Sequence, residues 1–406
     1  MNDTITKSPQ IRFAGFTDAW EQRELSQLAN FTKGSGYTKN DLREVGSPII
    51  LYGRLYTAYE TLIENVNTFV DEKENSVISL GGEVIVPSSG ESAEDISRAS
   101  VVGKPGIILG GDLNVIKPNE QIDSVFLALA ISNGAPNKDM AKRAQGKSVV
   151  HLHNSDLQKI NLVFPQIEEQ RNIVEFNLQL DNLITLHQRE LELLKDTKKS
   201  LLQKMFPKDG ANVPEIRFAR FTDAWEQRKF NEVFEERRDK TKVENEDTLL
   251  SCAINGMFLN SELFGHFRGS STIGYLKVKK NDLILSAQNL HLGNANVNLR
   301  FSHGIISPAY KVYELINSEP NFIQAWVKKD ETKNFFLAAT TEGASQCRKN
   351  IEWDRLYKQK MFVPAYKEQE AIGAFFLSLD NLITLHQREL NLLKNLKKSM
   401  LQQMFI

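Results

Sequence analysis

The sequence predicts a mixed α/β (α+β) protein: two globular domains, each built around a twisted sheet, and two long antiparallel helices forming a coiled coil with pseudo-two-fold symmetry. Three observations predict this fold: a double internal repeat, a heptad stripe in the longer repeat, and strand-like inserts between the repeats. At 406 residues the chain is also longer than one ordinary core, which favours two domains.

The shorter repeat is PQIRFAGFTDAWEQREL at 9–25, which returns as PEIRFARFTDAWEQRKF at 214–230. The longer repeat begins PQIEEQRNIVEF at 165 and PAYKEQEAIGAF at 364. Because the same series occurs twice in one chain, the order of elements is cyclic, and we expect Met1 and Ile406 to lie near one another.

The longer repeat contains LDNLITLHQREL, which is identical at 180–191 and 379–390. The inserts, roughly 29–160 and 234–360, have similar lengths but share little sequence. The short and long repeats, here called the frame, therefore occur twice and hold two different inserts. The predicted division is 1–160, first globular domain; 161–212, first long helix; 213–360, second globular domain; and 361–406, second long helix.

Both long repeats carry a stripe with alternating spacings of four and three residues, which is a coiled-coil seam. It runs through Leu180, Ile184, His187, Leu191, Leu194, Lys198, Leu201 and Met205, and through Leu379, Ile383, His386, Leu390, Leu393, Lys397, Met400 and Met404. The simplest partner for each helix is the other, in antiparallel order. A helix from Glu168 to Phe206 would be about 58 Å long at 1.5 Å per residue. We interpret the seam histidines as residues that favour one register.

The inserts contain short β-branched or alternating runs punctuated by Gly, Pro, Asn and Ser, which predict strands. These runs are SPIILYG, GEVIVPS, GIILGGDLNVI and KSVVHL in the first insert, and YLKVKKNDLILS and SPAYKVYEL in the second. The runs SVFLALAIS and NFIQAWVKK predict helices.

Composition excludes several classes of protein. No apolar run is long enough for a membrane span, and MNDTITKSPQ is no secretory signal. Only Cys252 and Cys347 could pair, so we expect a reducing cytoplasm. The net charge of −1 gives no whole-chain support to a nucleic-acid partner, so any binding face must be a local patch.

Catalytic motifs are missing from the sequence. Gly146-Lys147-Ser148 resembles the end of a phosphate loop, but Ala141 stands where the first glycine is required. No dinucleotide, nucleophile-elbow or zinc-protease motif occurs. His151 and His153 share one strand face without a completing ligand cluster, and no pair of carboxylates is singled out. We therefore predict no catalytic residue and no metal in this chain.

Polar loops beside the predicted strands are the remaining candidates. Arg and Lys neutralise phosphates or bind guanine, whereas Asn and Gln match adenine. In the first insert the candidates are Lys33, Ser35, Tyr37, Lys39, Arg54, Tyr56, Ser88, Ser89, Lys142, Arg143, Gln145 and Lys147. In the second they are Arg237, Arg238, Lys240, Lys242, Gln288, Asn289, His291, Gln346, Arg348 and Lys349. Surface loops are usually polar, so only the grouping of these residues favours DNA. Trp20 and Trp225 are interpreted as core anchors rather than partner-binding residues.

This arrangement resembles the DNA-specificity subunit of type I restriction-modification systems. The motifs that carry the resemblance are PxIRFxxFTDAWEQR before each insert, ISPAYKVY in the second insert, PxxxEQ at 165–170 and 364–369, and the LDNLITLHQREL helices. The resemblance covers essentially the whole chain. It implies two target recognition domains, each reading half of a split, asymmetric site in double-stranded DNA, with the helices as a ruler for the unread gap.

The resemblance also implies a non-catalytic chain with no bound cofactor. Its partners would be two methyltransferase subunits that bind S-adenosylmethionine, and two restriction or translocase subunits that use ATP and Mg²⁺. Consistent with this, the chain has no NPPF or DPPY adenine-methylation motif. Two other interpretations stay open: a coiled-coil adaptor that joins two proteins without binding DNA, and a fragment of a fused restriction enzyme.

Overall fold

The computed structural model describes residues 8–146, 149–208, 210–265, 271–345 and 348–405. The chain divides into two compact units. Unit 1 comprises Met1–Leu186 with Leu390–Ile406, and unit 2 comprises His187–Glu389. Each unit holds one insert, here called head 1 or head 2, together with parts of both long helices. The prediction of a mixed α/β protein is confirmed.

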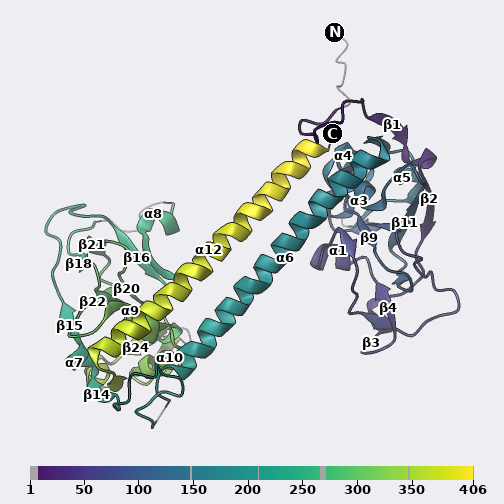
Figure 1. Ribbon diagram of the computed structural model, residues 1–406. Helices are drawn as coiled ribbons and strands as arrows, with labels where there is room; N and C mark the ends of the chain where they lie inside the picture. Colours follow the sequence, from purple (N-terminus) through teal and green to yellow (C-terminus); the bar gives the residue numbers. More distant parts are fainter. Residues whose placement is uncertain (1–7, 147–148, 209, 266–270, 346–347, 406) are drawn as a thin grey trace. The chain divides into compact units, whose positions relative to one another are not determined.

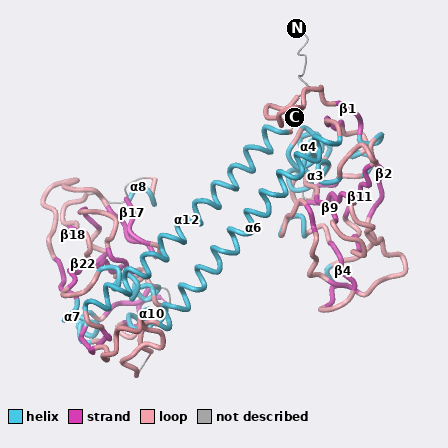
Figure 2. The backbone as a smooth tube through the Cα atoms, viewed as in Figure 1, coloured by secondary structure: helices cyan, strands magenta, loops and turns pink. Residues whose placement is uncertain are grey.

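The long helices are α6 (Ile167–Lys204) and α12 (Tyr366–Met404), and each begins just after the proline that opens its repeat, Pro165 or Pro364. In each unit a part of α6 lies beside a part of α12 (Figures 1 and 2). Ion pairs fix the antiparallel order: Lys397 binds Asp181 in unit 1, and Lys198 binds Asp380 in unit 2. Both lysines are polar members of the predicted seam, and both of their partners belong to the identical repeat.

The seam faces inward along both helices. Leu180, Leu191 and Leu390 are buried, and Ile184, His187, Leu194, Leu379, Ile383, His386 and Leu393 are partly buried. The residues between them are mostly exposed. This alternation is expected of a helix that buries one stripe.

Head 1 contains two larger sheets and two strand pairs among its described residues. The five-stranded sheet has the order β2 (Ala29–Lys33), β11 (Leu113–Pro118), β7 (Val84–Pro87), β9 (Ser100–Val102), β5 (Leu62–Ile63). The four-stranded sheet has the order β10 (Ile108–Leu109), β4 (Ser47–Ile50), β6 (Phe69–Val70), β3 (Leu42–Arg43). The pairs are β1 (Glu21–Glu24) with β13 (Asn161–Phe164), and β8 (Ser89–Gly90) with β12 (Val150–His151). The helices are η1 (Leu25–Gln27), η2 (Lys39–Asp41), α1 (Arg54–Thr57), α2 (Ala93–Ile96), α3 (Ser124–Asn133), α4 (Ala135–Arg143) and α5 (Asn154–Leu157).

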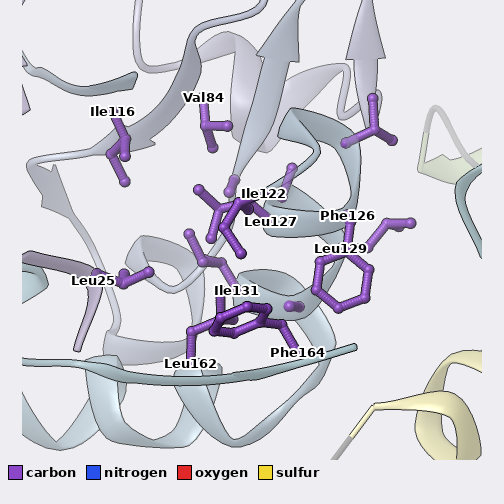
Figure 3. Close-up of a cluster of buried hydrophobic side chains, with 14 of the residues drawn as sticks. Leu25, Val84, Ile116, Ile122, Phe126, Leu127, Leu129, Ile131, Leu162 and Phe164 are labelled. Carbon is purple, nitrogen blue, oxygen red and sulfur yellow. The ribbon is translucent and has the colours of Figure 1, made fainter. Parts of the chain in front are cut away.

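The main core of unit 1 gathers around α3, whose apolar run SVFLALAIS is buried on all sides (Figure 3). Phe126 and Leu127 share one buried cluster with Val84 and Ile116 of the five-stranded sheet and with Leu162 and Phe164 of β13 (Figure 3). A helix that is hydrophobic all round belongs in such a position.

Head 2 is built differently. Its largest sheet has the order β15 (Phe234–Arg237), β22 (Tyr310–Leu315), β19 (Leu283–Ser286), β20 (Ala295–Val297). Strand pairs join β14 (Glu226–Lys229) to β25 (Lys360–Val363), β16 (Leu250–Ala253) to β17 (Gly256–Leu259), β18 (Leu276–Lys279) to β21 (His303–Ile306), and β23 (Thr340–Ser345) to β24 (Arg348–Ile351). The helices are α7 (Phe230–Val233), α8 (Asn260–Leu263), η3 (Leu290–Leu292), α9 (Pro320–Lys328), α10 (Asp330–Leu337) and α11 (Trp353–Lys358). Every run predicted as strand or helix in the two inserts contains the predicted element.

The repeated motifs make the same contacts in both units. Arg12 binds Glu169 at 2.7 Å, and Arg217 binds Glu368 at 2.7 Å, with both carboxylates buried. These hydrogen-bonded pairs raise the pKa of both arginines. The glutamines of the two PxxxEQ motifs each accept a backbone N–H at the start of a head helix: Gln170 from Asp123 at 2.8 Å, and Gln369 from Glu319 at 2.9 Å.

The repeated tryptophans are core anchors, as interpreted from the sequence. Trp20 and Trp225 are 2% and 3% exposed. Trp20 packs on Phe126 and Trp225 on Phe322, with ring centroids 6.0 and 5.8 Å apart. Each core is then completed by a phenylalanine at the far end of a long helix repeat, Phe405 in unit 1 and Phe206 in unit 2.

Met1 and Ile406, whose proximity was predicted, lie outside the described residues. Close to them along the chain, the N–H groups of Gln10 and Ile11 donate to the carbonyl of Gln403 at 3.0 and 3.2 Å. In unit 2, Ile216 donates to the carbonyl of Lys204 in the same way. Among the described helices none is long and apolar enough to cross a membrane.

The buried Arg217–Glu368 pair gives a stability prediction. Arg217→Met leaves the carboxylate of Glu368 buried without its cation, and we expect a loss of about 3–5 kcal/mol in the free energy of unfolding. The matched control is Arg228→Met, which removes the exposed pair with Glu226 and should cost about 1 kcal/mol or less. Urea denaturation measures both variants. Equal losses in the two would contradict the assigned role.

Candidate nucleic-acid interface

Three of the predicted polar loops meet at one groove in head 1. The groove has a volume of about 760 Å³. Its lining from these loops is Tyr37, Thr38, Lys39, Leu51, Tyr52, Gly53, Tyr56, Thr57, Ser89, Gly90 and Glu91. These residues come from separate stretches of the sequence, and the fold brings them together at this groove.

Hydrogen bonds and close packing hold the groove loops in place. Tyr56 donates to the carbonyl of Ser89 at 2.6 Å, and its ring meets that of Tyr52 edge to face at 5.9 Å. Burial raises the pKa of the Tyr56 hydroxyl, which therefore stays protonated and can donate. Gly90 permits this approach, since a Cβ there would lie 3.0 Å from the Tyr56 hydroxyl. Thr38 caps η2 and thereby positions Lys39.

The electrostatic character of the groove is mixed. Lys39 is exposed, whereas Glu91, Asp95 and Asp112 also line the groove. Carboxylates accept hydrogen bonds but repel phosphates, and hydroxyls both donate and accept. The groove therefore suits amino-bearing base edges better than it suits the phosphate backbone.

Several other predicted residues are exposed. In head 1 these are Lys33, Lys142 and Gln145, and in head 2 they are Arg238, Lys240, Lys242, Gln288 and Asn289. Arg238 is 78% exposed although it pairs with Glu236, so its guanidinium faces solvent. His291 lies in η3 and is partly buried. These side chains are placed where a phosphate or a base edge could reach them.

Four predicted residues in head 1 are instead tied into the protein. Tyr37 is 6% exposed, and its hydroxyl accepts from the N–H of Lys73 at 2.8 Å. Ser35 accepts from the N–H of Val77 at 3.0 Å, and Ser88 is buried. Arg54 donates to Glu60 at 2.6 Å and to the carbonyl of Asn65 at 2.9 Å. Their placement makes them supports of the groove loops rather than free contact groups.

Two predicted arginines are held by acids of their own head. Arg143 lies 3.2 Å from Asp139. Arg237, with a side chain 12% exposed, binds Asp282 at 3.1 Å and Glu314 at 2.7 Å. Burial raises the pKa of Asp282, and Arg237 opposes that rise. Arg237 is thus a structural cation of the β15–β22–β19 sheet.

The remaining predicted positions are Lys147, Gln346, Arg348 and Lys349. Lys147 and Gln346 lie outside the described residues, as does Cys347. Arg348 and Lys349 belong to β24.

Head 2 has no counterpart of the groove that gathers its predicted loops, within the residues described. Asn289 lines a smaller pocket of about 440 Å³ that also includes Cys252 and Tyr310. Burial raises the pKa of the Cys252 thiol to about 11, so this cysteine is an unreactive packing residue.

Tyr52, Asp95 and Asp112 line the head 1 groove but were missed from the sequence. Tyr52 precedes α1, and its place in the stretch YGRLYT beside the predicted Arg54 and Tyr56 was the available signal. Asp112 follows a Gly-Gly turn after β10, and nothing in its local sequence marks it.

The repeated motif FTDAWEQR forms an equivalent hollow in each unit. In unit 1 the hollow has a volume of about 740 Å³ and includes Arg12 and Asp18; in unit 2 it has about 470 Å³ and includes Arg217 and Asp223. Both are lined by the short repeat together with the start of a long helix. The frame thus presents one surface twice, whereas the heads present different ones.

The comparisons with known proteins agree with one another. Residues 17–196 match the family model described as the type I restriction modification DNA specificity domain. The chain is 26% identical over 200 residues to a protein named as the type I restriction enzyme MjaX specificity subunit of Methanocaldococcus jannaschii, covering 47% of this chain and 46% of that protein.

Two further comparisons span more of the chain. The type I restriction enzyme MjaVIII specificity subunit of the same organism is 21% identical over 369 residues, which is 85% of this chain and 84% of that protein. The crystal structure of a type I restriction-modification S subunit from M. genitalium covers 98% of this chain and 99% of its own, with a TM-score of 0.60 and 13% identity. At that identity the structural likeness shows the fold.

The burial of Tyr37 gives a prediction that distinguishes a side chain that stabilises head 1 from one that is free to contact DNA. Tyr37→Phe removes a hydroxyl that accepts from the Lys73 N–H and contacts the hydroxyl of Ser76 inside head 1, and we expect a loss of about 1–3 kcal/mol in the free energy of unfolding. The control Lys39→Ala, at an exposed position, should change it by no more than about 0.5 kcal/mol. Urea denaturation compares them, and an unchanged stability of Tyr37→Phe would show that the hydroxyl is no support.

Proposed function

Because this chain belongs with the specificity subunits of type I restriction-modification systems, we propose that its two heads read the two halves of a split, asymmetric site in double-stranded DNA. The observation that carries the proposal is the convergence of loops 33–39, 51–57 and 88–91 on one groove of head 1. A reader of bases needs hydrogen-bonding groups brought from several loops into one fixed array. Two heads with different sheets then read two different half-sites.

The groove of head 1 is the proposed base-reading surface. Its carboxylates accept from the amino groups of cytosine and adenine, and the hydroxyls of Tyr52 and Ser89 add donors and acceptors. Lys33, Lys39 and Lys142 are the proposed phosphate contacts of this head. In head 2 the exposed Arg238, Lys240, Lys242, Gln288 and Asn289 take these roles, together with His291, Arg348 and Lys349.

The frame is the proposed docking surface for two methyltransferase subunits. The equivalent hollows at FTDAWEQR support this, since two copies of one partner need two copies of one surface. Exposed leucines repeat along the helices as well: Leu183 with Leu382, and Leu186 with Leu385, each between 39% and 54% exposed. The same apolar side chains are thus exposed on both helices, which supports a contact with two copies of one partner.

The chemistry is assigned to the partners. We propose that the methyltransferase subunits bind S-adenosylmethionine and methylate adenine, and that two restriction subunits cleave DNA with ATP and Mg²⁺. This chain would contribute no catalytic group and bind none of these cofactors. Its part is to place the DNA.

Methylome sequencing of cells that express this chain with its methyltransferase subunit tests the proposal. We expect modified adenines in one bipartite, asymmetric motif. Gel shifts of the complex should show the same preference. A complex with no sequence preference would instead favour the adaptor interpretation.

Two substitutions in the groove should have different effects. Lys39→Ala should weaken DNA binding about equally for all sequences and reduce the slope of log affinity against log salt by about 1. Asp112→Asn should relax the preference at one position of one half-site, by about 1–3 kcal/mol. Gel shifts over a salt series, with single-base variants of the site, measure both. Loss of preference in both half-sites from either change would contradict a reader confined to head 1.

We further propose that the long helices set the length of the unread gap. Inserting the same seven residues into α6 and α12 adds about two helical turns, roughly 10 Å, and keeps the seam in register. With base pairs about 3.4 Å apart, we expect a gap longer by at least one base pair and unchanged half-sites. Methylation mapping reads both features. An unaltered gap would refute the ruler.

A further inference from the structure

A polar layer interrupts the seam where His187 of α6 meets His386 of α12. Both histidines belong to unit 2, and their ring centroids are 5.8 Å apart. Each ring has a glutamate of the opposite helix nearby. The Nδ1 atom of His187 lies 3.8 Å from Glu389 Oε2, and that of His386 lies 3.6 Å from Glu190 Oε2.

This layer lacks the hydrogen bonds that satisfy the other polar seam positions. Both Nδ1 atoms are buried and have no hydrogen-bond partner. Both distances to the glutamates are too long for a hydrogen bond. By contrast, the seam lysines Lys198 and Lys397 are each paired with an aspartate. Buried polar atoms without partners are uncommon and call for a bound species or another explanation.

We propose that His187, His386 and Glu389 form a binding site for a divalent metal ion of the zinc type, with Glu190 beside it as the source of a fourth oxygen. One ligand atom from each of the first three residues lies within 4.8 Å of the other two. A bound zinc ion needs ligand atoms about 2.0–2.2 Å from it. Side-chain rotations that move each ligand atom by about 1 Å or less would bring them to this distance.

The ligand types select the class of metal. Neutral imidazole suits zinc and the neighbouring transition metals, whereas calcium and magnesium prefer oxygen ligands alone. Two histidines with one or two glutamates match the mixed nitrogen and oxygen sets that zinc accepts. Each helix contributes a His-x-x-Glu pair, and this i, i+3 spacing places both side chains on one helix face.

The proposed site would act as a clamp between α6 and α12 within unit 2. A metal that binds the folded protein and not the unfolded chain stabilises it by mass action. The ion would occupy the layer in which the seam otherwise leaves polar nitrogens buried and unpaired. Pairing of the helices would then depend on metal supply as well as on leucine packing.

Calorimetric titration of the untagged full-length chain with zinc chloride, after chelator treatment, tests the proposal. We expect one ion per chain. Cobalt(II) in place of zinc should give the intense visible absorption of a tetrahedral site. Zinc should also raise the melting temperature of the chain. These readouts require neither DNA nor the partner subunits, so they are independent of the proposed function.

His187→Gln with His386→Gln is the decisive variant, because glutamine keeps a polar, helix-compatible side chain at both positions. We expect zinc affinity to fall by at least about tenfold, since removing even an outer-shell partner of a metal ligand costs ten- to a hundredfold. Glu389→Gln, which leaves both rings in place, should also weaken binding and serves if the double variant does not fold.

The matched control is His151→Gln with His153→Gln. These two rings stack 6.5 Å apart in head 1, but no carboxylate completes a cluster with them among the described residues. We expect the control to bind zinc as the wild type does. The proposal is overturned if the wild type binds no zinc, or if the control loses affinity while the double variant at 187 and 386 retains it.

Discussion

The structure depends on one constraint: the hydrophobic core of each head is incomplete without a side chain from the other copy of the long repeat. In unit 1 the ring of Phe405, just past the end of α12, packs on Phe126 of α3. In unit 2 the ring of Phe206, just past the end of α6, packs on Phe322 of α9. Each core therefore includes a helix end that belongs to the other copy of the long repeat. The antiparallel order of the helices follows from this exchange, because a helix that begins beside one head must end in the core of the other.

The elements could be predicted from the sequence because their signals are local and repeated. A seam of eight positions predicts a long amphipathic helix, and its presence in both copies of the long repeat strengthens that prediction. The strand runs of the inserts are short, but valine and isoleucine between turn residues mark them well. The roles of Arg12 and Glu169 could not be predicted in this way. They lie 157 positions apart, and no local pattern tells a buried ion pair from two surface charges.

The candidate site could be predicted only in part, because exposure is a tertiary property. Lys39 and Tyr37 stand in one polar loop, yet the first is exposed and the second is 6% exposed. The difference arises from the small core of Ile49, Val70 and Ile108, which the Tyr37 ring completes. Arg237 and Arg238 differ for a similar reason: Arg237 is the last residue of β15 and its side chain meets Asp282, whereas Arg238 follows the end of the strand and faces solvent. Residue type and loop position identify the region, whereas the strand register decides which side chain is free.

The way in which each head is attached explains how two unlike inserts fit one frame. The glutamine of each PxxxEQ motif accepts the backbone N–H of a helix-capping residue, Asp123 in head 1 and Glu319 in head 2. Any residue except proline offers that N–H, so the contact places no demand on the sequence of the insert. Three residues further on, both heads present a phenylalanine to the repeated tryptophan. The frame thus requires a helix start and one aromatic ring from each insert. Sheets as different as those of the two heads satisfy both requirements, which leaves the loops free to vary with the DNA sequence they are proposed to read.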